Sequence, residues 1–117
     1  MKSLAQLSDK NYRVYNVKTG KEVSFESIAD DMADKDVLFF GEEHNDSVTH
    51  WLESQMLELM YKKYEAKTAL SMEMFERDVQ PVMDEYLGGW IREKSFKKDA
   101  RVWSNYADYR PMVEYAK

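Results

Sequence analysis

The sequence of 117 residues contains no cysteine, no long apolar run and no concentrated basic stripe. The lack of cysteine excludes disulfide bonds and thiolate metal sites, but it does not indicate a cellular compartment. Without a long apolar run, the chain has no candidate for a transmembrane segment. The net charge is -5 with 17 basic residues, so nucleic acid is not an expected partner.

The chain also lacks repeats and low-complexity tracts, and its composition is that of an ordinary folded protein. Hydrophobic residues make up 44% of the sequence, which is enough for one modest core. Eight tyrosines, eight methionines and three tryptophans are many for this length. Such side chains suit a surface that receives a large flat ligand or a partner, although aromatic packing in a small core is the simpler explanation.

The N-terminal third predicts an arm, a β-hairpin and a short helix. Residues 1–10 carry little pattern and are expected to form a flexible arm. Two segments of β-forming residues, 12–15 and 22–25, flank a turn in which Gly20 can adopt a positive φ. Ser24 can then cap a short amphipathic helix.

The segment 37–40 has the strongest strand pattern in the chain. Its four apolar residues end at Gly41, which can let the backbone turn sharply. A helical period extends over 48–64 after three good N-cap residues. A second mainly apolar run, 69–75, follows this helix. Strand, helix and strand predict a right-handed parallel βαβ unit over residues 37–75.

Residues 78–117 are expected to be a helical region. Asp78 can cap a helix over 79–86, which Gly88 and Gly89 would end. A final helix is predicted over 108–116, whereas the stretch between these helices has no clear pattern.

The predicted fold class is therefore α/β, with an N-terminal β-hairpin, the parallel βαβ unit and flanking helices. The last helix presents four apolar or aromatic side chains for burial at the very end of the chain: Tyr109, Met112, Val113 and Tyr115. Two parallel strands are also too few for an independent sheet of this class. We expect residues 1–117 to be a single α/β domain or the N-terminal fragment of a larger one, completed by a missing C-terminal half or by another copy in a homo-oligomer.

The polar residues that follow the two predicted strands are candidate ligands. Glu42, Glu43 and His44 leave the first strand, and Glu73 lies near the end of the second. The carboxyl ends of neighbouring parallel strands, about 4.8 Å apart, meet at one edge of a sheet. We expect Glu42, His44 and Glu73 to share an ion, a water or a ligand there. The simpler alternative is a solvated loop in which Glu42 or Asp46 stabilises the helix N-terminus.

Two motifs occur in an order that resembles the ChaN-like iron-regulated lipoproteins of Gram-negative bacteria. They are Gly41-Glu42-Glu43-His44 and Met72-Glu73-Met74-Phe75-Glu76-Arg77-Asp78. Trp103 and Tyr109-Arg110-Pro111 also look like that family. The resemblance covers residues 37–117 and implies haem binding for iron acquisition, in the periplasm or anchored to the outer membrane. It also implies a mixed α/β fold related to erythromycin esterases and to the TraB and Tiki proteins.

Residue by residue, the resemblance assigns Gly41, Glu42, His44 and Glu73 to the binding site and leaves Glu43 in a variable position. A further Gly-x-x-His motif of the family's second half is absent here. We expect haem binding without turnover. The alternative is a metal-dependent hydrolase in which the same side chains hold a divalent ion whose water attacks an ester or amide. A third interpretation is an interaction module with an aromatic docking face.

Haem needs axial ligands and partners for its propionates. Tyr106 and Tyr109 are candidate phenolate ligands, since tyrosine and histidine both ligate haem iron. Arg77 and Arg110 can each grip a propionate with two parallel hydrogen bonds, or bridge a neighbouring glutamate instead. His50 either faces the same site or is an exposed helix residue, and we expect the second.

Overall fold

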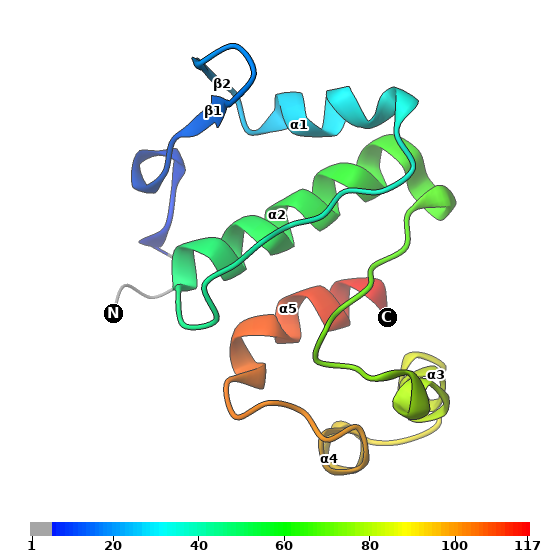
Figure 1. Cartoon of the computed structure of the whole chain (residues 1–117). Helices are drawn as coiled ribbons and strands as arrows, with labels where there is room; N and C mark the ends of the chain where they lie inside the picture. The colour runs from blue at the N-terminus through cyan, green and yellow to red at the C-terminus, as the bar shows by residue number, and fades with distance from the viewer. Residues whose placement is uncertain (1–5) are drawn as a thin grey trace. The chain divides into compact units, whose positions relative to one another are not determined.

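The structure, a computed structural model, describes residues 6–117 and divides the chain into two compact units, Met1–Thr68 and Ala69–Lys117 (Figure 1). The elements of the first unit are, in order, η2 Asp9–Asn11, β1 Val14–Asn16, β2 Lys21–Val23, α1 Glu26–Asp31, η3 Met32–Asp34, α2 Ser47–Tyr64 and η4 Glu65–Lys67. Those of the second unit are η5 Arg77–Val79, α3 Gln80–Leu87, α4 Glu93–Asp99 and α5 Tyr106–Ala116.

The predicted β-hairpin is confirmed. β1 and β2 pair antiparallel, with Val14 opposite Val23, and Gly20 in the connecting turn has a φ of 69°. The Asn16 side chain stabilises this turn, because its oxygen accepts a hydrogen bond from the backbone N–H of Lys18 at 3.0 Å. Residues 1–5 of the expected arm lie outside the described part of the chain. The end of the expected arm contains η2, which begins with a capping box at Ser8.

The first unit is built around α2, the longest helix of the described residues. α1 packs on α2, and Phe25, Ala29 and Met56 form the buried centre. The partly buried residues around this centre come from the hairpin, both helices and the chain between them: Tyr12, Val14, Ile28, Leu38, Phe40, Leu52, Leu59 and Met60. The amphipathic faces predicted for both helices thus bury each other, as their period requires.

The chain between η3 and α2 is extended and runs alongside α2 (Figure 1). Leu38 and Phe40 pack against the core, whereas Val37 and Phe39 are 63% and 92% exposed. This alternation is the side-chain period of a strand. However, residues 37–40 are not assigned as a strand, since a strand also requires a hydrogen-bonded neighbour.

The parallel βαβ unit expected over residues 37–75 is not observed. Among the residues that the structure describes, the hairpin is the only sheet. The second predicted strand is interrupted by a turn, in which the N–H of Phe75 donates to the carbonyl of Met72 at 3.2 Å. An apolar run indicates that side chains are buried, but it does not determine the backbone conformation. Here the side chain of Met74 is buried although its backbone forms a turn.

Phe96 is the fully buried centre of the second unit. Its ring stacks on Tyr86 with a centroid distance of 4.3 Å, and Phe75 and Tyr106 contact it at 5.7 and 6.1 Å. These contacts join α3, α4 and α5. No pattern in the sequence predicts α4, since only one residue of this short helix is buried.

Two expectations about the C-terminal helices are wrong. Asp78 does not cap α3, whose N-cap position is Val79. The carboxylate of Asp78 instead accepts hydrogen bonds from Arg101 at 2.8 and 3.0 Å. Of the side chains expected to lack burial, Tyr109, Met112 and Val113 are already buried, whereas Tyr115 is 39% exposed. The predicted final helix itself is confirmed as α5. No helix within residues 6–117 is long and apolar enough to cross a membrane.

Candidate functional site

The N-terminus of α2 holds the candidate site in place. The carboxylate of Asp46 accepts a hydrogen bond from the N–H of Val48 at 3.0 Å and another from the hydroxyl of Thr49 at 2.7 Å. Both bonds lower the pKa of Asp46, and the bond from Thr49 has the larger effect. The charged carboxylate therefore stabilises the cap of the helix. Just before the cap, the N–H of Asp46 donates to the carbonyl of Glu43 at 3.0 Å. This turn fixes the loop that carries Glu42 and His44.

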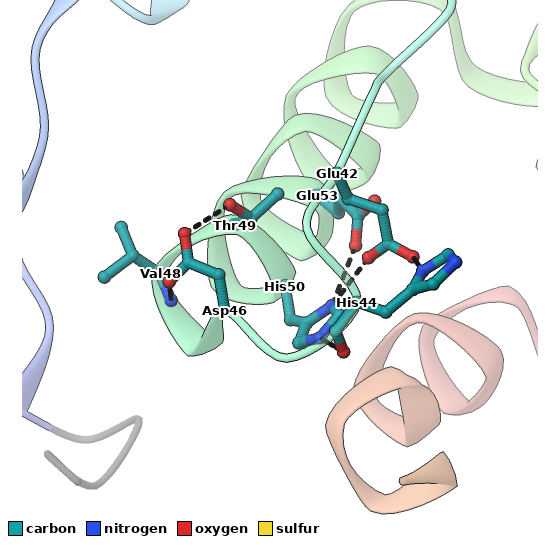
Figure 2. Close-up of polar contacts among 7 residues, drawn as sticks. All are labelled: Glu42, His44, Asp46, Val48, Thr49, His50 and Glu53. Carbon is teal, nitrogen blue, oxygen red and sulfur yellow. Dashed lines mark hydrogen bonds and ion pairs between the residues drawn. The ribbon is translucent and has the colours of Figure 1, made fainter. Parts of the chain in front are cut away.

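The carboxylate of Glu42 lies between two imidazoles (Figure 2). One oxygen, Oε1, is 2.6 Å from Nδ1 of His44, and the other, Oε2, is 2.9 Å from Nδ1 of His50. The side chain of Glu42 is only 13% exposed, whereas that of His44 is 56% exposed. Glu42 therefore connects an exposed imidazole with an interior one.

His50 is buried, with 1% of its surface exposed. The expectation of an exposed helix residue is thus wrong. Its Nε2 lies 2.9 Å from the carbonyl oxygen of His44, and its Nδ1 lies 3.3 Å from Oε2 of Glu53, one turn further along α2. A carbonyl oxygen can only accept, so Nε2 carries a hydrogen and donates it. Nδ1 then faces the carboxylates of Glu42 and Glu53.

The electrostatics of the site follow from burying two carboxylates beside one imidazole. Burial raises the pKa of Glu53, and the charge of Glu42 raises it further, while the hydrogen bond with His50 opposes both. Burial by itself would lower the pKa of His50, but the hydrogen bond to His44 and the two carboxylates outweigh it and raise that pKa. The cluster therefore favours a positive charge at Nδ1 of His50.

The remaining residues predicted from the two motifs are exposed. Gly41 does not have a positive φ, and a Cβ there would meet no atom within 4 Å, so nothing in the backbone requires a glycine. Glu43 points to solvent. Glu73 and Arg77 are exposed on the second unit, in the turn before η5 and in η5 itself.

The candidate haem partners on α5 have other contacts in the structure. Arg110 binds Glu93 with two hydrogen bonds, of which that from Nη2 to Oε2 measures 3.2 Å; the predicted alternative of a bridge to a glutamate is therefore observed. Tyr109 is buried with its ring edge against Trp103 at 5.8 Å. Tyr106 is 3% exposed, and burial, followed by the charges of Glu93 and Glu114, raises its pKa to about 12.

The sequence interpretation missed Glu53 and undervalued His50. Both lie on the face of α2 that also carries the buried Met56, at intervals of three residues. A histidine and a glutamate at positions i and i+3 on a buried helix face require partners, since buried polar side chains need hydrogen bonds. That spacing was the available signal.

The architecture and this site define a helix-rich protein of mixed α and β structure, with a histidine and carboxylate centre at the start of its longest helix. The chain belongs to the ChaN family of the Tiki superfamily, described as haem-binding uptake, whose family model matches residues 28–117. The resemblance noted in the motifs is thereby confirmed. No curated protein and no solved structure significantly matches this chain.

Proposed function

We propose that this protein binds haem for uptake in the bacterial cell envelope, with His44 as the ligand of the haem iron. Its family is described as haem-binding uptake. The observation that carries the assignment to His44 is the 2.6 Å hydrogen bond between its Nδ1 and Oε1 of Glu42. An exposed imidazole held in this way is a suitable iron ligand.

The hydrogen bond matters because it determines which ring nitrogen can bind iron. A carboxylate at Nδ1 favours the tautomer that carries its hydrogen there and has its lone pair on Nε2. Such a carboxylate also orients the ring. In Figure 2 the His44 ring points away from His50, toward the outside of the cluster. Haem is the cargo in this proposal, and histidine is one of its ordinary axial ligands.

Tyr106 offers an independent ligand. Its hydroxyl is buried and has no hydrogen-bond partner in the described part of the chain, a rare condition for a buried polar group. Ferric iron accepts phenolate oxygen, and a metal ion reverses the cost of ionising such a group. The raised pKa of Tyr106 means that the free protein keeps the phenol neutral. Tyr106 is therefore the second position to test.

We also propose that residues 37–40 act as a β-strand of an α/β sheet. The alternation of the exposed Val37 and Phe39 with the partly buried Leu38 and Phe40 supports a strand at this position. Amide hydrogen exchange tests it, since a paired strand protects alternate N–H groups. Uniformly fast exchange of residues 37–40 contradicts the proposal.

Haemin titration of the purified chain tests the proposed function. We expect a shifted Soret band that saturates at one haem per chain. His44→Ala should abolish or shift this band, whereas Glu43→Ala, next to it on the exposed loop, should not. Tyr106→Phe and Tyr109→Phe report whether a phenolate takes part. No Soret shift with the wild-type chain contradicts the proposal.

The proposed location is the periplasm or the outer membrane, to which the protein would be anchored. Fractionation of cells that express the natural gene, with an antibody against this chain, tests it. Recovery in the cytoplasmic fraction contradicts an envelope role, independently of haem binding.

The second candidate is a metal-dependent hydrolase of esters or amides. The observation in its favour is the meeting of Glu42, His50 and Glu53, which are side chains of the kinds that bind divalent ions. A bound ion would supply an activated water. Cleavage of a chromogenic ester that requires added metal, and that Glu53→Gln abolishes, would support this candidate over simple haem binding.

A further inference from the structure

Three side chains of the first unit bring potential metal ligands together at the interior side of the site. Nδ1 of His50 and one carboxylate oxygen each of Glu42 and Glu53 all lie within 4.8 Å of one another. His50 is 1% exposed, and the carboxylate side chains are 13% and 12% exposed. The ligand atoms thus converge on one small, nearly enclosed point (Figure 2).

The hydrogen bond of His50 to the backbone determines what Nδ1 can bind. Nε2 donates to the carbonyl of His44 at 2.9 Å, so in the neutral ring the lone pair is on Nδ1. That lone pair faces carboxylate oxygens at 2.9 and 3.3 Å. Electron pairs on both sides repel each other unless a proton or a metal ion lies between them. A histidine whose second nitrogen donates to a backbone carbonyl is the usual arrangement of a metal ligand.

A divalent cation balances the charge of this cluster. With neutral His50 and both carboxylates ionised, the three side chains carry two negative charges, and a divalent ion leaves none. Such an ion therefore avoids the cost of uncompensated buried charge.

We propose that Glu42, His50 and Glu53 form a site for a divalent first-row transition metal, next to the proposed haem ligand His44, which is hydrogen-bonded to the other oxygen of Glu42. One imidazole and two carboxylates suit zinc, manganese or ferrous iron. For tetrahedral zinc, with bonds of about 2.0–2.1 Å, neighbouring ligand atoms lie about 3.3 Å apart. The observed separations of Nδ1 from the two oxygens, 2.9 and 3.3 Å, are close to that value. A water molecule completes the coordination of the ion.

Calorimetric titration of the metal-free chain with Zn²⁺ tests the site. We expect one zinc per chain, with a higher unfolding temperature when the metal is bound. Glu53→Gln keeps the shape of the side chain and should weaken binding at least tenfold. Glu58→Gln is the matched control, because Glu58 lies on the same helix, away from the cluster, and pairs with Lys62 at 3.8 Å; it should bind zinc as the wild type does.

A Co²⁺ spectrum provides a readout that does not depend on the stability of the variants. The wild-type chain should give the intense visible bands of a four- or five-coordinate ion with nitrogen and oxygen ligands, and excess Zn²⁺ should remove them. No zinc uptake by the wild type, or equal uptake by Glu53→Gln and Glu58→Gln, would overturn the proposal.

The His44→Ala variant separates this proposal from haem binding. It should lose the Soret shift but keep its zinc, because His44 supplies none of the three ligand atoms. His44 touches the site through its backbone carbonyl, which accepts from His50, and through Nδ1, which is hydrogen-bonded to the other oxygen of Glu42. Loss of zinc in His44→Ala with retention in Glu53→Gln would overturn the assignment of ligands. Failure to bind haem, by contrast, leaves the zinc result unaffected.

Discussion

Replacing Glu42 by glutamine should weaken haem binding about tenfold, because one carboxylate supports both imidazoles. Its two oxygens lie 2.6 Å from Nδ1 of His44 and 2.9 Å from Nδ1 of His50. A carboxylate can accept at both oxygens, whereas an amide has a single acceptor oxygen. Glutamine therefore cannot serve both rings, and any bond that remains lacks the negative charge.

The magnitude follows from the strength of that charged hydrogen bond. Hydrogen bonds to charged groups contribute about 1.5–3 kcal/mol, and charge-assisted bonds are roughly twice as strong as neutral ones. Loss of the charge thus costs the haem complex about 1–1.5 kcal/mol, which is close to a factor of ten in the dissociation constant. The Glu42 side chain is 13% exposed and that of His44 is 56% exposed, so solvent screens this bond mainly from the side of His44.

The assay is a haemin titration of the wild type, Glu42→Gln and Glu43→Gln, followed at the Soret band. Glu43 is the adjacent, exposed carboxylate. Glu43→Gln removes the same charge without removing a bond to the imidazoles, so this variant should bind haem within about twofold of the wild type. Circular dichroism confirms that all three proteins are folded. Equal affinities for the two variants would refute the supporting role of Glu42.

Three further predictions concern the scaffold. Asp46→Ala should destabilise the protein by about 1 kcal/mol in urea unfolding, and Asp46→Asn by less, because alanine removes the α2 cap and asparagine retains one. Gly89→Ala should lower the free energy of unfolding by about 1–2 kcal/mol, since Gly89 has a φ of 76° even though no atom lies near its Cβ position. Gly41 has no positive φ, so Gly41→Ala should be nearly neutral. Tyr106 has a folded pKa of about 12, so the stability that its neutral phenol contributes is complete below the unfolded value of about 10 and is lost as the pH rises to 12. Between pH 10 and pH 12, the free energy of unfolding should therefore fall less steeply with pH in Tyr106→Phe than in the wild type.

The local elements could be predicted because each is determined by short-range chemistry. The turn glycine Gly20 and the β-forming residues on either side give the hairpin, and Asp46 marks the start of α2. α4 could not be predicted because its single buried residue, Phe96, creates no helical period. Parallel pairing depends on a partner strand far along the chain, and an alternation such as that of Leu38 and Phe40 carries no information about the partner.

The candidate site was predicted in part. The interpretation of the sequence placed Glu42 and His44 in one loop, and the structure brings them into contact. It did not foresee His50 and Glu53, because their burial depends on how the loop folds back over the first turns of α2. Helical spacing alone relates His50 to Glu53; the contact with Glu42 comes from the tertiary fold.

The resonance Raman spectrum of the ferrous haem complex tests the central claim most directly. A histidine ligand gives an iron–imidazole stretching band, and hydrogen bonding of its Nδ1 to a carboxylate strengthens the iron bond. We expect this band in the wild type, at lower frequency in Glu42→Gln and absent in His44→Ala. A complex without the band, or with a band that both substitutions leave unchanged, would contradict binding through the Glu42 and His44 pair.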